Sequence, residues 1–169
     1  METLLAIRTR RSIRNFFNKE IPKEQITKIL EAAMYAPSAR NTQPWHFIVI
    51  NRRQILDKLP HVHPYAEMCY EAGAAILVCG DTEIERLEGY IAVNCAAATQ
   101  NILLAAHDLG LGAVWLGVYP RKERMESLSR LFNLPQNIIP ISLVALGYPK
   151  EQINTPERFN QKKIHYNEW

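Results

Sequence analysis

The segment at residues 84–109 constrains the fold of this chain more than any other part of it. Its pattern predicts one long helix that ends at Gly110, and the central stretch IAVNCAAATQNILLAA is apolar or small on nearly every face. A helix that is apolar all round is buried all round, and a chain of 169 residues has little material to surround one. We therefore predict a homodimer with this helix at the subunit contact. The alternative is a central helix inside a monomer.

The rest of the chain alternates between predicted helices and strands. Helices are expected at residues 3–9, after IPKEQ up to Pro37, at 54–59 and at 121–132. Runs of β-branched and aromatic residues predict strands at 45–50, 74–80, 112–120 and 138–149. This pattern favours an α+β fold, with a central mixed β-sheet flanked by helices. No linker or repeat interrupts it, so we expect a single domain over residues 1–169.

Charge and cysteine content exclude several functions. The net charge of +3, from 20 basic and 17 acidic residues, is too small for a protein dominated by phosphate backbones, so we expect no nucleic-acid partner. No apolar run reaches the ~18–20 residues that span a bilayer, so we expect no membrane partner. The cysteines form no CxxC pair, and Cys69, Cys79 and Cys95 lie in apolar surroundings. They are expected to be buried, reduced thiols in a cytoplasmic protein.

Two segments carry polar groups suited to a ligand. RTRRSIR (8–14) combines arginines with a serine beside a helix end, and guanidinium forks and a hydroxyl bind phosphate well; a solvated basic helix end is the alternative. The loop PSARNTQPW (37–45) offers donors and acceptors that could read the edge of a heterocycle, although a polar loop without such a role is equally open. The remaining polar segment, after Pro149, is studded with apolar residues and predicts an arm lying across a surface.

Other motifs lead to no site. His61 and His63 form an HxH pair, but no carboxylate or cysteine stands at ligand spacing, so we expect no metal site. Gly110 and Gly112 follow a helix and open a strand, the opposite order from a dinucleotide fingerprint. No nucleophile stands with an evident base, and no catalytic side-chain acid or base is expected. A cofactor would then supply the reactivity.

Taken together, five segments resemble the nitroreductase family of flavin enzymes. They are RRSIRNF at 10–16, APSARNTQPWHFIVI at 36–50, the alanine-rich helix, GAVWLG at 112–117 and the ERF…KKIHYNEW tail. The resemblance runs from about residue 3 to the C-terminus. It implies a nitroreductase-like α+β fold and a domain-exchanged homodimer with a C-terminal arm. It also implies two tightly bound FMN molecules at the interface, in active sites shared by the subunits.

The resemblance assigns FMN contacts residue by residue. The phosphate and ribityl chain would be held by one group of residues: Arg10, Arg11 and Ser12, with Lys163 and Lys162 adding phosphate contacts. The flavin ring would be met by a second group: Arg14 near N1/O2, Leu116 and Gly117 near N5, and, from the other subunit, Pro37, Ser38, Ala39 and Asn41. Arg40 stands where other members often have a small or polar residue. The region around 66–70 offers no clear counterpart of the asparagine and lysine that larger members bring to the ring.

The implied activity is an NAD(P)H-dependent oxidoreductase. Hydride would pass from NADH or NADPH to flavin N5 and on to a nitroaromatic, quinone or similar small acceptor, with ping-pong kinetics. Between Gly80 and Tyr90 there is no room for the helical lid of larger members, so an open pocket is expected. The alternatives are another flavin reaction on this fold, reductive dehalogenation or flavin fragmentation, or an FMN-binding protein without turnover.

Overall fold

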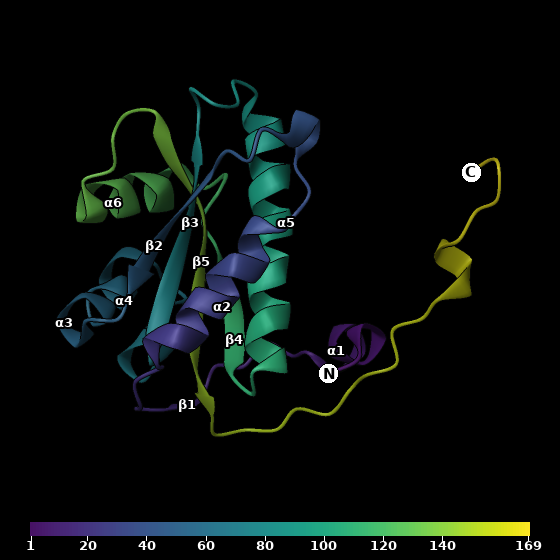
Figure 1. The fold of residues 1–169 in the computed structure, drawn as a ribbon, viewed down its shortest axis with the longest axis horizontal. Coiled ribbons are helices and arrows are strands. Elements are labelled where there is room, and N and C mark those ends of the chain that lie inside the picture. The colour runs from purple at the N-terminus through teal and green to yellow at the C-terminus, as the bar shows by residue number, and fades with distance from the viewer.

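The computed structural model describes residues 1–169 and contains a five-stranded sheet with helices on both faces (Figure 1). The strands follow the order β1-β5-β3-β2, and β4 pairs with β5 as well. The strands are β1 (Phe16–Phe17), β2 (Trp45–Ile50), β3 (Ala74–Asp81), β4 (Gly112–Gly117) and β5 (Ile138–Pro149). The α-helices are α1 (Thr3–Thr9), α2 (Lys23–Met34), α3 (Arg53–Leu56), α4 (Leu59–Val62), α5 (Glu88–Asp108) and α6 (Lys122–Phe132).

The sheet differs from the predicted mixed sheet because every ladder between its strands is antiparallel. β3, α5 and β4 form a crossover unit, and β3 and β4 run in the same direction. The last strand, β5, lies between them and pairs antiparallel with both. The only parallel pairing is an isolated bridge between Ser12 and Ala113. The sequence pattern predicts the strands but not that a later strand inserts between two earlier ones.

The helices cover two separate cores, one on each face of the sheet. Helices α2 and α5 pack on one face, while α3, α4 and α6 lie on the other (Figure 1). The predicted helix at 54–59 is two short helices, because Pro60 lies in the first turn of α4 and a proline cannot extend a preceding helical ladder. Gly110 has φ +76°, which is the left-handed cap expected after α5.

Helix α5 is not enclosed within one chain. Its inner face is buried against the sheet and α2, but Tyr90 and Val93 are exposed, Val93 by 65%. The surface of α1 is similarly open at Leu4, Leu5 and Ile7. A single chain therefore does not bury α5 all round, and these two helices leave apolar surface uncovered.

The C-terminal segment after β5 extends away from the rest of the chain as an arm (Figure 1). Apart from Glu151, which is half-buried, its residues are exposed, and Trp169 is fully so. The one short helical turn in it is η3 (Gln161–Lys163). None of the helices has the length and apolar character needed to cross a membrane.

The three cysteines are buried and free, as predicted. Burial raises the pKa of each thiol to about 12. They therefore behave as small apolar side chains inside the core.

Candidate functional site

Residues 10–14 leave α1 and are anchored on the beginning of β4. The backbone N–H of Ile13 donates to the carbonyl of Ala113 at 3.0 Å, and Ser12 forms the isolated bridge to the same residue. The absence of a side chain at Gly112 allows this approach, because a Cβ there would lie 2.8 Å from Cγ2 of Ile13. The sheet edge thus fixes the backbone of the basic segment.

The side chains of Arg10 and Arg11 concentrate positive charge in this segment. Arg11 is held by the end of α1, since its Nη1 donates to the carbonyl of Arg10 at 2.6 Å and its Nη2 to that of Arg8. Its Nε is buried without a partner. The pKa of the Arg10 guanidinium lies below its ordinary value. Burial is the largest cause, followed by the positive charges of Arg11 and Arg158. Neither Arg10, Arg11 nor Arg158 takes part in an ion pair. Such a cluster suits an anion.

His107, in the last turn of α5, faces the same cluster. Its Nε2 lies 2.8 Å from the hydroxyl of Thr9. Burial, followed by the charges of Arg10 and Arg11, lowers the pKa of its ring. Sequence reasoning missed this residue, because nothing in the helical pattern singles out one histidine so far along the chain from the basic segment.

The loop at residues 36–44 is a tight, irregular structure. Arg40, Asn41 and Gln43 have φ of 55°, 55° and 48°, in the left-handed region that non-glycine residues rarely occupy. The backbone N–H of Gln43 donates to the hydroxyl of Ser38 at 3.0 Å, which closes the loop on itself. Backbone strain of this kind often accompanies ligand-binding segments.

Two contacts attach this loop to α5 and to the segment before it. The N–H of Ala39 donates to Oδ1 of Asn94 at 3.0 Å, and Nδ2 of that buried asparagine has no partner. Arg40 forms an ion pair of 2.6 Å with the buried carboxylate of Glu85. The N–H of Leu87 and then Arg40 hold the pKa of Glu85 below its usual range. The amide of Asn94 is thus only half satisfied within one chain.

The end of β4 presents an open glycine. A Cβ at Gly117 would meet no atom within 4 Å, whereas Leu116 beside it is buried. The carbonyl of Gly117 accepts from Nη1 of Arg124 at 2.7 Å and from Nε2 of His63 at 2.9 Å. The backbone beside this open space is therefore held firmly by two side chains.

Arg14 lines a cavity of about 500 Å³ together with residues of the 67–71 segment. Its backbone N–H donates to the carboxylate of Glu151 at 2.9 Å, which ties the beginning of the arm to this site. The lining residues are Arg14, Asn15, Glu67, Met68, Tyr70 and Glu71. The region around 66–70 thus lies beside Arg14, where Glu67 and the adjacent Glu71 stand and no asparagine or lysine of that region does.

These arrangements match a known family of proteins. The model of the nitroreductase family matches residues 7–76 and 60–148, which include the basic segment, the loop and β4. This chain belongs to the nitroreductase family. A relative from Methanothermobacter thermautotrophicus, provisionally named NADH dehydrogenase/NAD(P)H nitroreductase, is 51% identical over all of this chain and 88% of its own length.

Solved structures agree with the nitroreductase family fold. One from Parabacteroides distasonis, with the same provisional name, has a TM-score of 0.94 at 40% identity and covers 99% of this chain and 98% of its own. A provisionally named nitroreductase from Desulfovibrio desulfuricans, solved in complex with FMN, has a TM-score of 0.85 at 33% identity. That match covers 100% of this chain and 99% of the other. The predicted family and its α+β fold are confirmed.

In one chain of this nitroreductase family member, the residues expected to bind FMN form two separate groups. Arg10, Arg11 and Ser12 lie together near the C-terminal end of α5, and the 36–44 loop lies near its N-terminal half. Between Asn94 and His107 the helix runs about 20 Å at 1.5 Å per residue. One chain therefore does not bring the two groups together.

The two lysines of the arm that were expected to bind the FMN phosphate lie away from the basic segment at residues 10–14. Lys162 and Lys163 lie on η3, exposed, on the part of the arm that extends beyond α1 (Figure 1). Arg158 is the arm residue whose charge acts on Arg10. No group of three or more histidine, cysteine or acidic side chains has the arrangement of a metal site.

Proposed function

We propose that this nitroreductase family member is a homodimer that transfers hydride from NAD(P)H through flavin N5 to nitroaromatics, quinones or similar small acceptors. Its family and relatives make the chain an NAD(P)H-dependent oxidoreductase, with FMN as the cofactor. Donor and acceptor use one pocket in turn, which gives ping-pong kinetics. Residues 1–169 act as one FMN-binding domain. The three buried thiols accord with a reducing compartment, the cytoplasm.

The observation that carries this proposal is the unneutralised cluster of Arg10 and Arg11 beside the anchored Ser12. An arginine held at a helix end, a partly buried second arginine and a hydroxyl are the donor set that a phosphate monoester requires. The partnerless Nε of Arg11 leaves a donor available for such an oxygen. The chain's own groups therefore fit the phosphate of FMN.

The ring end of the site fits a planar heterocycle. FMN, when bound, supplies the hydride chemistry through its ring. Leu116 and the open Gly117 would lie beside N5, and Arg14 would place a cation at the N1/O2 edge, where it favours negative charge. The chain provides binding, orientation and charge, and we assign no side chain as a proton donor or acceptor.

Two chains are needed to complete one site. The 36–44 loop contacts α5 about 20 Å along the helix from His107, which faces Arg10, so we assign this loop to the FMN held by the other chain. Exposed apolar residues on α1 and α5, and the extended arm ending in Trp169, provide the surface that a second copy would cover. We propose that Pro37, Ser38, Ala39 and Asn41 of one subunit meet the FMN of the other, and that Lys162 and Lys163 join the phosphate once the arm is docked.

An absorbance spectrum tests the function directly. The purified protein, or the protein supplied with FMN, should show bound flavin that anaerobic NADH or NADPH bleaches, followed by reoxidation with a panel of quinones and nitroaromatics. A protein that takes up no FMN contradicts the proposal. Bound flavin that saturating NADH and NADPH leave oxidised would identify a flavin-binding protein without this activity.

A further inference from the structure

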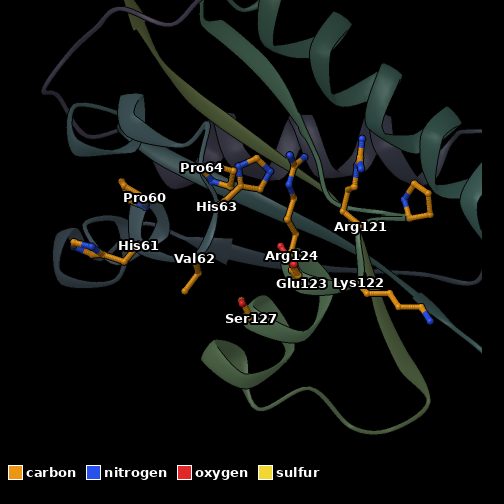
Figure 2. Close-up of a pocket in the computed structure, with 11 residues that line it drawn as sticks. Pro60, His61, Val62, His63, Pro64, Arg121, Lys122, Glu123, Arg124 and Ser127 are labelled. Carbon is orange, nitrogen blue, oxygen red and sulfur yellow. The ribbon is translucent and has the colours of Figure 1, made fainter.

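A second large cavity lies between α4 and the beginning of α6, outside the expected FMN contacts (Figure 2). Its volume is about 880 Å³. One wall comes from residues 60–64 and the other from residues 120–127. Only one lining side chain, that of Glu123, is acidic, whereas Arg121, Lys122 and Arg124 are cationic.

The cations of this cavity have no anionic partners. None of Arg121, Lys122 and Arg124 takes part in an ion pair. Arg124 is held in place, because it donates to the carbonyl of Gly117 and lies 5.2 Å from the centre of the Tyr65 ring. Arg121 and Lys122 are exposed and their side chains form no hydrogen bond within the chain, so their charges are available to a ligand.

The cavity adjoins the candidate flavin site at Gly117. Figure 2 shows His63 and Arg124 reaching toward each other from the two walls, and both bind the carbonyl of this glycine. The ring of His63 is fixed on both sides, since Nε2 donates to Gly117 and Nδ1 accepts from the N–H of Tyr65 at 3.2 Å. A ligand that reaches Gly117 with one end would have this basic cavity at its other end.

We propose that the cavity between α4 and α6 binds the phosphate groups of the nicotinamide donor, with Arg121 and Lys122 as their main ligands. This inference rests on the proposed function. The donor carries an uncharged reacting ring at one end and phosphates farther along, which matches an open glycine beside a cationic cavity. Either the diphosphate or the 2′-phosphate of NADPH has the required charge and oxygen geometry.

The experiment uses FMN-loaded protein and the double variant Arg121→Gln/Lys122→Gln. Calorimetric titration with NADP⁺ and NAD⁺ gives the Kd for each, and anaerobic bleaching of the flavin at rising NADPH and NADH gives the limiting rate of reduction. We expect Kd to rise about tenfold or more, because charge-assisted bonds are lost, with the limiting rate within about twofold of wild type. Arg130→Gln is the matched control, because it removes a charge from the same helix outside the cavity.

The titration results show which phosphate of the donor lies in the cavity, or that neither does. Weaker binding of NADP⁺ alone places the 2′-phosphate in the cavity, and equal weakening of NADP⁺ and NAD⁺ places the diphosphate there. If the variant binds both dinucleotides with the wild-type Kd, the inference is wrong. This conclusion holds even if the variant binds an anionic acceptor such as nitrobenzoate more weakly. Failure of the proposed function looks different, because the wild-type flavin then resists bleaching, while titration with NADP⁺ still tests the cavity.

Discussion

The buried amide of Asn94 accepts a hydrogen bond of 3.0 Å from the backbone N–H of Ala39. This single contact joins the middle of a loop with three left-handed residues to the first half of α5. A loop in such a costly backbone conformation keeps its shape only where its surroundings hold it. Asn94 is therefore a positioning residue for the part of the loop that we assign to FMN.

Replacing Asn94 should affect FMN binding as well as stability. Asn94→Ala removes the acceptor for Ala39, which costs about 1 kcal/mol of unfolding free energy, and loosens the loop. Asn101→Ala is the matched control, because Asn101 also lies on α5 and makes one hydrogen bond, donating its amide to the carbonyl of Ala32 on α2. Urea unfolding should show comparable losses for both, while flavin fluorescence should show a weaker FMN Kd for Asn94→Ala alone. An equal Kd in the two variants would contradict the role of the loop.

The variant Arg10→Gln should weaken FMN binding without lowering the stability of the fold. Loss of a charge-assisted bond to phosphate should raise the Kd for FMN by about tenfold to a hundredfold. Removing one of several crowded like charges should leave the unfolding temperature of the FMN-free protein unchanged or slightly higher. Arg52→Gln, at an exposed cation elsewhere, serves as control. Comparable FMN affinity in both variants would show that the cluster holds no phosphate.

Shared sites predict complementation between two defective chains. The pair Arg10→Gln/Arg11→Gln damages the phosphate half of the site. Asn41→Gly damages the loop half while keeping a residue that tolerates positive φ. Each homodimer should bind FMN poorly, whereas co-expressed chains should give a mixed dimer with one intact site and about half the wild-type flavin content. No recovery in mixed dimers purified with two different tags would refute site sharing.

His63 should make stability fall as the pH falls. Burial holds the pKa of its ring below the ordinary 6.5, although the Gly117 carbonyl acts in the opposite direction. Below 6.5 the unfolded chain takes a proton that the folded chain resists, so the contribution of His63 is complete above 6.5. As the pH falls from 6.5 toward the pKa of His63 in the folded chain, this contribution to the free energy of unfolding is lost by at most about 1.4 kcal/mol per pH unit.

The test compares urea unfolding at pH 7 and pH 5.5 in the protein without FMN. His63→Gln can still donate to Gly117 but does not titrate, so its stability should fall by less than that of the wild type. His61→Gln changes an exposed ring in the same cavity and should keep the wild-type fall. If His63→Gln and the wild type lose the same free energy, the buried ring is not the group responsible.

Local pattern was enough to predict most of the elements. β5 spans Ile138–Pro149, as the run of β-branched residues predicts, and Gly110 ends α5 in the left-handed conformation. The segment RTRRSIR stood out because arginines and serine beside a helix end form a phosphate-binding set within a few residues. These features depend on neighbours in sequence, and for that reason a sequence can reveal them.

The family, the α+β elements, the buried thiols and the basic segment could all be predicted from the amino-acid sequence, because each is encoded by residues close together along the chain. The tertiary structure was needed to show that β5 inserts between β3 and β4, that His107 faces Arg10, and that Glu67 reaches the cavity of Arg14. It also placed the 36–44 loop and the basic segment toward opposite ends of α5. Contacts between distant segments depend on how whole elements pack, and no local pattern of side chains contains that information.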